Sequence, residues 1–541
     1  MTRVLRVRWL GRVRYRDAQV LQHALFERSP DDHLLLLEHP HVYTLGVRAD
    51  PANVLVPPAD VGAELVKTDR GGDVTYHGPG QLVGYPILTI PGKRGGGMAD
   101  TVAYVRSVEQ LLIDALADLG LPGAARLDGY PGVWIEDRKI AAIGVRLSRG
   151  RTMHGFALNV DPDLTYFDHI VPCGIRDKRV TSLAAEGVDV DMRAVVDAIA
   201  ARAVERWGDG GRERQDLAWR EPRQRSEPLR RQDRLAEAGV GEGLSIASPK
   251  PDFVKARLRI TDDYIRLKRT MRDLSLVTVC EEAGCPNIFE CWSAGTATFM
   301  INGERCTRAC GFCLVDTRHP LPIDDTEPAR VAEAVERMGL RFVVITAVAR
   351  DDVDDGGAAA FASTIAAIRR RTAHVRVEVL VPDCKGDPSA LETIFAAGPD
   401  VVNHNLETVL RLQRVVRPSA SYARSLAVLA RAKDAGHTTK SGIILGMGER
   451  EDEVLGALAD LRSVGVDIVT LGQYLRPTDQ HLPVARWWAP DEFDRLKEAG
   501  EALGIAHVEA SPLTRSSYHA AEADEAAGVS LALSPRRATA V

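Results

Sequence analysis

The sequence lacks the features that mark membrane, secreted or nucleic-acid-binding proteins. Among its 541 residues, no apolar run is long enough to cross a bilayer. The Arg-rich start has no apolar core before a small-residue cleavage site, as a secretion signal would have. The net charge of −6 gives no reason to expect nucleic-acid binding. We therefore expect a cytoplasmic protein that binds neither nucleic acid nor membranes.

Cysteine is scarce, and most of it lies in one short stretch. Six of the eight cysteines fall between positions 280 and 313. They form two triplets with the spacings C-x4-C-x5-C and C-x3-C-x2-C, namely Cys280, Cys285 and Cys291, then Cys306, Cys310 and Cys313. Three thiolates on a short loop can hold a cubane iron–sulfur cluster and leave one iron without a protein ligand. Two triplets predict two clusters.

Other uses of these cysteines fit the spacing less well. Thiols inside a cell stay reduced, and groups of three pair poorly as disulfides. Zinc sites take four ligands, often in regular pairs that this stretch lacks. A ferredoxin would show C-x2-C-x2-C followed by a distant Cys-Pro pair. Iron–sulfur binding is the interpretation that we carry forward.

The first 208 residues predict an α+β domain. A composition of 45% hydrophobic and 27% charged residues is ordinary for soluble globular protein, and the length suggests several domains. Strands predominate and do not alternate regularly with helices. Strands are predicted near 33–40, 81–88 and 154–160, a hairpin at 132–147, and helices at 101–120 and 192–207.

The rest of the chain predicts a linker and a second domain. Residues 209–250 are rich in Arg and Glu, so we predict a charged linker there. From 251 to 541, strands alternate with amphipathic helices, which predicts an α/β partial (β/α)6 TIM barrel with a tail that is disordered after about 525. The six strand candidates are 297–301, 341–348, 375–382, 399–407, 438–446 and 466–475.

Several residues of this second domain have two open interpretations. Chemistry in such barrels sits at the C-terminal ends of the strands, and Arg350, Glu407 and Lys440 lie near such ends. Each of the three could line a cofactor site or form a structural ion pair. Cys384 has no partner spacing around it, so we interpret it as a buried, incidental thiol.

The second cysteine triplet, with Phe312 before its last cysteine, resembles the radical S-adenosylmethionine superfamily. The resemblance implies that the open iron chelates S-adenosylmethionine, whose reductive cleavage gives a 5′-deoxyadenosyl radical. The protein then positions the cofactor and excludes water, while the cofactor performs the difficult step.

Further motifs narrow this resemblance to one family. CEEAGCPNIFECW, NHNLET (403–408), KSGIILGMGE (440–449), LGQYLRPT (471–478) and RSSYHA (515–520) resemble lipoyl synthase over about 251–525. The resemblance implies two [4Fe-4S] clusters and S-adenosylmethionine as cofactors. The first triplet, with Ser516 or Ser517 as the fourth ligand, would hold an auxiliary cluster that is consumed as the sulfur source. The implied reaction inserts sulfur at C6 and C8 of a lysine-bound octanoyl chain.

Two features of the N-terminal domain carry chemistry only in combination. RGGDVTYHGPGQLVGYP (70–86) holds five glycines, which allow close approach of backbone to a ligand but equally suit a turn-rich surface loop. Cys173 is the one cysteine of this domain, and a lone cysteine is more often a small buried hydrophobe than a nucleophile. A neighbouring charge could lower its pKa, and Lys139 is a candidate partner.

Together, RGG-x-x-T-x-H-x-PGQ, DRKIAAIGVR, HGFALNV and VPCGI…TSL resemble octanoyl-[acyl carrier protein]–protein octanoyltransferase over about 5–208. The resemblance implies the biotin/lipoate protein ligase type of fold. Cys173 would take the octanoyl group as a thioester with the help of Lys139, then pass it to a lysine of a lipoyl domain. A lipoate–protein ligase shares the fold but uses ATP and needs no cysteine nucleophile. The implied substrate-binding residues are Arg70, Gly71, Gly72, Asp73, Val74, Thr75, Tyr76, His77, Ala142, Ile143, Gly144, Gly155, Phe156 and Ala157.

These resemblances predict a bifunctional enzyme of lipoate biosynthesis, an octanoyltransferase domain (1–208) joined to a lipoyl synthase domain (251–541). The implied partners are octanoyl-acyl carrier protein, the lipoyl domains of 2-oxoacid dehydrogenases, the glycine cleavage H protein, and an electron donor such as ferredoxin or flavodoxin. Two alternatives stay open. One is a lipoate–protein ligase fused to another sulfur-inserting radical enzyme, and the other is a non-catalytic iron–sulfur carrier with an acyl-binding module.

Overall fold

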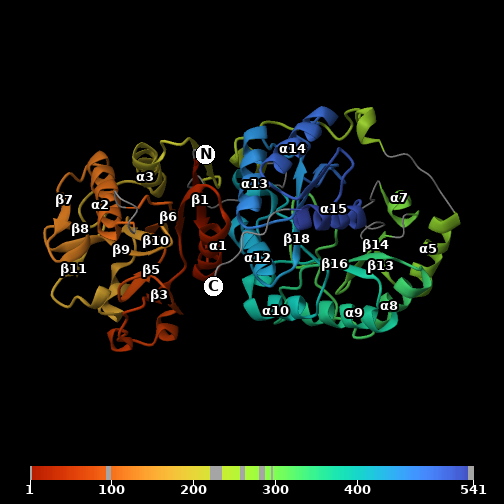
Figure 1. Ribbon diagram of the computed structural model, residues 1–541, viewed down its shortest axis with the longest axis horizontal. Helices are drawn as coiled ribbons and strands as arrows, with labels where there is room; N and C mark the ends of the chain where they lie inside the picture. The colour runs from red at the N-terminus through yellow and green to blue at the C-terminus, as the bar shows by residue number, and fades with distance from the viewer. Residues whose placement is uncertain are drawn as a thin grey trace. The chain divides into compact units, whose positions relative to one another are not determined.

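The computed structural model describes residues 3–92, 99–219, 234–255, 262–278, 287–293 and 296–533 (Figure 1). Its contacts divide the chain into unit 1, Met1–Leu217, and unit 2, Ala218–Val541. Within the described residues, no helix combines the length and the apolar character needed to span a membrane.

Unit 1 is built on a nine-stranded, mostly antiparallel sheet. Its strand order is β12-β1-β2-β6-β10-β9-β8-β7, with β11 beside β9, and β1 runs parallel to both β2 and β12. A second sheet has the order β4-β3-β5. The strands are β1 (Leu5–Arg12), β2 (Asp32–Glu38), β3 (Val42–Leu45), β4 (Glu64–Lys67), β5 (Val74–His77), β6 (Gln81–Ile87), β7 (Ala124–Leu127), β8 (Tyr130–Ile135), β9 (Arg138–Ser148), β10 (Arg151–Asn159), β11 (Arg179–Val180) and β12 (Arg212–Asp216).

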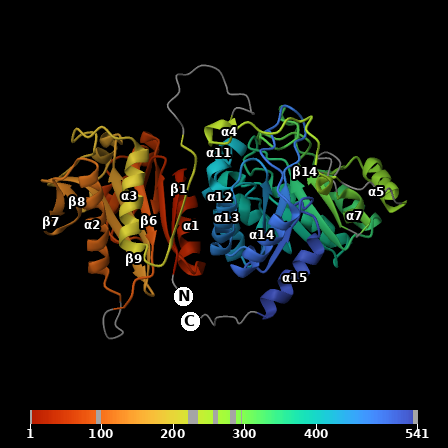
Figure 2. The ribbon, with the colours of Figure 1, turned by 90° about the horizontal axis from the view of Figure 1, so that it is seen from above.

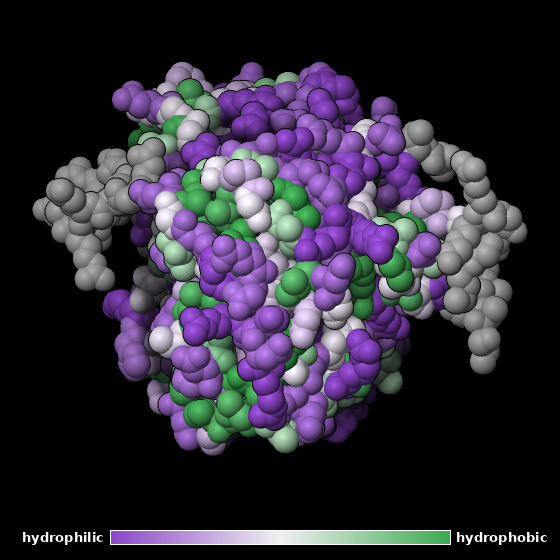
Figure 3. Space-filling model, turned by 90° about the vertical axis from the view of Figure 1, so that its left-hand side faces the viewer, coloured by the Kyte–Doolittle hydropathy of each residue, from purple (hydrophilic) through white to green (hydrophobic). Residues whose placement is uncertain are grey.

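Three helices cover the large sheet, as the predicted α+β class requires. They are α1 (Tyr15–Arg28), α2 (Thr101–Asp118) and α3 (Met192–Trp207). Helices α2 and α3 pack against each other (Figure 2). Helix α1 packs on β6 and β10. On the side of unit 1 that carries β7, β8 and β11, hydrophilic residues predominate and hydrophobic residues form separate groups (Figure 3). The predicted hairpin at 132–147 is present as β8 and β9.

The predicted linker over 209–250 is wrong at both of its described ends. Residues Arg212–Asp216 form β12, and Arg8 of β1 donates to Glu213 at 3.0 Å. Charged residues suit such an edge strand because their side chains pair across to the next strand. At the other end, Leu235 of the short helix α4 (Arg234–Glu237) is buried in unit 2. Residues 220–233 lie outside the described ranges.

Unit 2 is built on an eight-stranded sheet whose strands follow one another in chain order, β13 to β20. Strand β13 is antiparallel to β14, and every pair from β14 to β20 is parallel. The strands are β13 (Val277–Thr278), β14 (Thr296–Ile301), β15 (Phe342–Ala347), β16 (Arg376–Leu380), β17 (Val401–Asn403), β18 (Thr438–Leu445), β19 (Ile468–Gln473) and β20 (His507–Ala510). All six predicted strands occur, and β20 adds a seventh parallel one.

A helix follows each of the parallel strands, and these helices surround the sheet (Figure 1). They are α8 (Glu327–Arg337), α9 (Ala358–Arg371), α10 (Pro388–Ala396), α12 (Tyr422–Asp434), α13 (Glu451–Ser463), α14 (Pro490–Ala502) and α15 (Ala520–Leu533), with α5 (Asp262–Asp273), α7 (Ile288–Ser293) and α11 (Gln413–Val416) elsewhere. Val343, Val377 and Val402 are completely buried, as expected for parallel strands covered on both faces.

The prediction of a disordered tail after about 525 is wrong up to residue 533, because α15 occupies that stretch. Its small residues allow close packing: Ala520 lies against Phe342 and Val344, and Ala523 lies against Ile468. An ion pair of 2.7 Å joins Arg376 of β16 to Asp524 of α15. Residues 534–541 lie outside the described ranges.

Candidate active sites

Segments far apart in the sequence line one cavity in unit 1. They are the start of α1, β5 with the stretch that leads into it, and parts of β6, β9 and β10. The cavity measures about 340 Å³, including space open to solvent. Of the predicted substrate-binding residues, it is lined by Arg70, Thr75, His77, Ala142, Gly144, Gly155, Phe156 and Ala157, and also by Tyr15, Val83, Tyr85 and His154, which the sequence reasoning missed. Gly71, Gly72, Asp73, Val74, Tyr76 and Ile143 are their chain neighbours and do not line it.

Glycines allow these segments to approach each other. Gly144 and Gly155 lie opposite each other on β9 and β10. A Cβ atom on Gly155 would lie 2.1 Å from the carbonyl oxygen of Gly84, and one on Gly144 would lie 3.1 Å from that of Gly71. A side chain at Gly155 would therefore push β10 away from β6, which is why the close packing requires glycine there.

Arg70 brings a buried positive charge to the cavity wall. Its guanidinium donates to the carbonyl oxygens of Thr44 at 2.6 Å and Gly71 at 3.1 Å. No carboxylate pairs with it among the described residues, and burial lowers its pKa, while Tyr15 and Cys173 act in the opposite direction. A guanidinium without a carboxylate partner suits a negatively polarised ligand atom.

Neither Cys173 nor Lys139 lines this cavity, but Cys173 lies close enough to Arg70 to act on its pKa. Cys173 is partly exposed in a short turn, Pro172–Gly174, and has a left-handed φ of 56°, a strained conformation that is common at functional sites. Lys139 is buried on β9, with its Nζ 4.7 Å from the centre of the Trp134 ring. In the part of the chain that the structure describes, no hydrogen bond or ion pair joins Cys173 to Lys139.

Unit 2 has a larger cavity at the C-terminal ends of its parallel strands. It measures about 1850 Å³, including space open to solvent. Cys306, Cys310 and Cys313 line it from the loop after β14, and Ser516 lines it from the RSSYHA segment. The position agrees with the expectation that chemistry sits at this edge of the sheet.

The three cysteines suit an iron–sulfur cluster. The backbone N–H groups of Arg308 and Ala349 both donate to Cys306 Sγ at 3.4 Å. Burial raises the pKa of Cys313 to about 12, so this thiol needs a bound cation to ionise. Among the described residues, no three metal-binding side chains converge on one ion position. A cubane cluster does not require such convergence, because each of its cysteines binds a separate iron.

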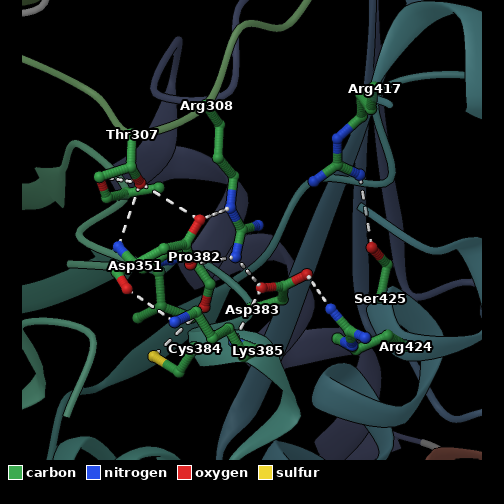
Figure 4. A network of polar contacts seen from close by, with 12 residues as sticks. Thr307, Arg308, Asp351, Pro382, Asp383, Cys384, Lys385, Arg417, Arg424 and Ser425 are labelled. Carbon is green, nitrogen blue, oxygen red and sulfur yellow. Dashed lines mark hydrogen bonds and ion pairs between the residues drawn. The ribbon is translucent and has the colours of Figure 1, made fainter. Parts of the chain in front are cut away.

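Arg308, between two of these cysteines, fastens their loop to the sheet (Figure 4). Its guanidinium donates to both oxygens of Asp351, at 2.7 and 2.8 Å, and to Asp383 at 2.6 Å. Asp351 follows β15 and Asp383 follows β16. Burial acts to raise the pKa of Asp383, but Arg308 and Arg424 outweigh it and hold that pKa well below its usual range. We call Arg308 with Asp351 and Asp383 the Arg308 clamp. The sequence analysis did not predict it, although a charged residue between two candidate ligand cysteines could have indicated it.

Arg350, Lys440 and Glu407 each had two possible roles from the sequence, and their contacts now distinguish them. Arg350 pairs with Asp352 at 2.8 Å, and Lys440 pairs with Glu378 at 3.1 Å in the core. Neither lines the cavity, so their contacts are those of structural ion pairs. Glu407 lines the cavity with a left-handed φ of 68°, and burial raises its pKa.

The first triplet is described only at Cys291, since Cys280 and Cys285 lie outside the described ranges. Cys291 lies on α7, which docks on the segment that carries Ser516 and Ser517. Asn287 donates to the carbonyl oxygen of Leu513 at 2.7 Å, and the Tyr518 hydroxyl lies 3.2 Å from Glu290. Of the two serines, only Ser516 lines the cavity.

Cys384 is buried, as predicted for an incidental thiol. Burial raises its pKa to about 12. A neutral, buried thiol of this kind is chemically inert.

Family models match both units. The Lipoyl protein ligase A/B catalytic domain matches residues 14–203. The N-terminal domain of lipoyl synthase of the Radical_SAM family matches 222–285, and the Radical SAM superfamily matches 300–461.

Similar proteins include two lipoyl synthases. That of Rubrobacter xylanophilus is 56% identical over 278 residues, which cover 51% of this chain and 87% of the relative. That of Mycobacterium tuberculosis H37Rv is 52% identical over 303 residues, which cover 56% of this chain and 97% of the relative. Among solved structures, a putative lipoate protein ligase from T. acidophilum with bound lipoic acid is 18% identical, with a TM-score of 0.33, over 40% of this chain and 90% of that one. The chain thus belongs to the lipoyl synthase family of radical S-adenosylmethionine enzymes, with a lipoate/biotin ligase-type catalytic domain at its N-terminus.

Proposed function

We propose that the chain performs two consecutive steps of lipoate biosynthesis on one carrier lysine. Unit 1 transfers octanoyl from octanoyl-acyl carrier protein to a lysine of a lipoyl domain. Unit 2 then inserts sulfur at C6 and C8 of that octanoyl chain. The observation that carries this proposal is the presence, in one chain, of a lipoyl synthase and a ligase-type domain whose one cysteine lies close to Arg70 of the cavity wall.

In unit 1, Cys173 Sγ attacks the thioester carbonyl of octanoyl-acyl carrier protein. A new carbon–sulfur bond forms as the old one breaks, and the carrier thiol leaves with the cysteine proton. Lys139 assists by favouring the thiolate and moving protons. The 70–77, 142–144 and 155–157 segments bind the octanoyl group, which is supported by the cavity that they line in part.

In unit 2, family membership implies S-adenosylmethionine and iron–sulfur clusters. We assign one [4Fe-4S] cluster to Cys306, Cys310 and Cys313, and a second to Cys280, Cys285 and Cys291 with Ser516 or Ser517. When bound, these groups supply the radical chemistry and the sulfur. The strand ends of a partial (β/α)6 barrel enclose the cofactor and exclude water from it.

The proposed partners follow from these reactions. They are octanoyl-acyl carrier protein, the lipoyl domains of 2-oxoacid dehydrogenases, the glycine cleavage H protein, and an electron donor of the ferredoxin or flavodoxin type. Because both units act on the same carrier lysine, tethering raises the local concentration of unit 2 near the product of unit 1.

One reconstitution tests the whole proposal. The full chain is loaded anaerobically with iron and sulfide, then given octanoyl-acyl carrier protein, a lipoyl domain, S-adenosylmethionine and a reductant. Mass spectrometry of the carrier lysine should show octanoyl first and lipoyl later. Transfer that needs free octanoate and ATP, and that survives Cys173→Ala, would replace the octanoyltransferase with a ligase. Clusters that reduce and reoxidise without cleaving S-adenosylmethionine would indicate an iron–sulfur carrier.

A further inference from the structure

Unit 1 holds a buried carboxylate–imidazole pair that the roles above do not use. His154 lines the cavity, is 1% exposed, and its Nε2 lies 2.7 Å from Asp69 Oδ1. Its other ring nitrogen, Nδ1, is buried without a hydrogen-bond partner among the described residues. A buried polar atom without a partner is costly, so its presence in a cavity indicates that a ligand provides the missing bond.

The charge of Asp69 fixes which ring nitrogen carries the proton. Burial acts to raise the pKa of Asp69, but His154, His23 and Arg146 outweigh it and hold that pKa far below its usual range. The ionised carboxylate accepts a hydrogen bond, so Nε2 of His154 must carry the hydrogen. Burial lowers the pKa of His154 more than its hydrogen bond to Asp69 raises it, which favours the neutral ring. Nδ1 is therefore a bare lone pair, ready to accept a proton.

The backbone holds this ring in a strained position. His154 has a φ of 60° in the middle of β10, where side chains normally require an extended conformation. Its N–H donates to Gln22 Oε1 of α1 at 3.0 Å. A left-handed residue within a strand is strained, and such strain persists mainly at functional sites.

We propose that His154 is a catalytic residue of unit 1, and that its Nδ1 accepts the proton of the incoming lysine amine during acyl transfer. The amine nitrogen bonds to the thioester carbonyl carbon and the bond from that carbon to Cys173 Sγ breaks. The amine proton goes to His154 and is then returned to the departing thiolate. The step needs no further reactant.

The transfer step needs such a base more than the loading step does. A lysine amine is protonated near pH 7, so it loses one proton to solvent before it attacks and must lose a second, here to His154, as the amide forms. In the loading step the attacking group is a thiol, whose proton has the proposed Lys139 and the leaving carrier thiolate as acceptors. This inference rests on the proposed function of unit 1.

The test uses the full chain and measures the two half-reactions separately. Mass spectrometry after rapid quenching follows octanoyl loading on Cys173, and then its loss to a lipoyl domain. His154→Gly suits the left-handed backbone and should leave loading within about threefold of the native rate, while transfer falls by about 100-fold or more. Added imidazole should restore part of the transfer rate, which a merely structural role would not allow.

Two further variants sharpen the test. In Asp69→Asn, the amide can donate to Nε2 and so favour the tautomer with hydrogen on Nδ1, and transfer should fall by about tenfold or more. Arg149→Gln removes an exposed ion pair with Glu27 and should leave both rates near native. Native transfer by the His154→Gly variant, or an equal fall in loading and transfer that imidazole does not rescue, would overturn the inference. A native protein that forms no thioester on Cys173 would instead defeat the proposed function, and this inference with it.

Discussion

The two cavities are built from opposite kinds of backbone. In unit 1, the walls are the middles of antiparallel strands, brought together by Gly144 and Gly155. In unit 2, the walls are the C-terminal parts of parallel strands and the loops that follow them, and ion pairs such as Arg308 with Asp383 hold those loops. Close backbone packing keeps the cavity of unit 1 narrow. Strand ends leave space for bulky cofactors. The loops there are less closely packed, so ion pairs such as those of Arg308 must hold them in position.

The largest effect should come from Cys173→Ala, which separates the two units functionally. Without the sulfur no thioester forms, so octanoyl transfer should fall by about 1000-fold or more in a mass-spectrometric assay. Sulfur insertion into a lipoyl domain that already carries octanoyl should continue, because the radical chemistry lies in unit 2. Loss of both activities would show that the units are not independent.

The next effect concerns the clamp of unit 2. Arg308→Gln leaves two carboxylates beside the cysteine loop without their main cation, and removing one partner of such a buried pair costs about 3–5 kcal/mol. Iron content after reconstitution should fall, and the electron paramagnetic resonance of the reduced cluster should change. Arg318→Gln is the matched control, since Arg318 is 75% exposed near the same loop. The double variant Arg308→Gln/Asp383→Asn should recover part of the stability, and unchanged spectra in the single variant would contradict a positioning role.

A smaller effect should follow from a single methyl group in unit 1. Gly155→Ala places a carbon 2.1 Å from a carbonyl oxygen, so strands β6 and β10 must separate at a cost of about 1–3 kcal/mol. Thermal unfolding should report a lower melting temperature. In Gly123→Ala no atom lies within 4 Å of the new carbon, so the melting temperature should be nearly unchanged. Equal melting temperatures for the two variants would show that close backbone approach is not what limits this cavity.

The smallest effect is a pH dependence in unit 2. Burial raises the pKa of Asp524 from 3.8 to about 6, so the folded state binds a proton more tightly than the unfolded chain. This contribution to stability is complete below about pH 4 and is lost as the pH rises through 6. The change should be about 1 kcal/mol, because solvent screening reduces the effect of the shift. Denaturant unfolding measures the free energy of unfolding at pH 5 and pH 7. In Asp524→Asn the difference between these two free energies should be smaller.

The sequence predicted the elements that a local pattern of apolar residues determines. It missed the elements and side-chain pairs that depend on contacts between distant residues. Strands β14 to β19 are apolar runs followed by helices, and they occur as expected. Strand β12 is charged and β20 is only four residues long, so neither shows an apolar run. The motifs predicted the segments of both cavities, because glycines and cysteines have few substitutes. Asp69 and His154 are separated by 84 intervening positions, and only the folded sheet brings them into contact.

The pairing of β12 with β1 has a practical consequence for cutting the chain. The last strand of unit 1 covers one edge of its first, so a fragment that stops at residue 208 would leave that edge open to other chains. We expect such a fragment to aggregate, whereas one that extends through Leu217 should stay monomeric. During synthesis, the sheet of unit 1 cannot be completed until Asp216 has left the ribosome, when most of unit 2 is still untranslated.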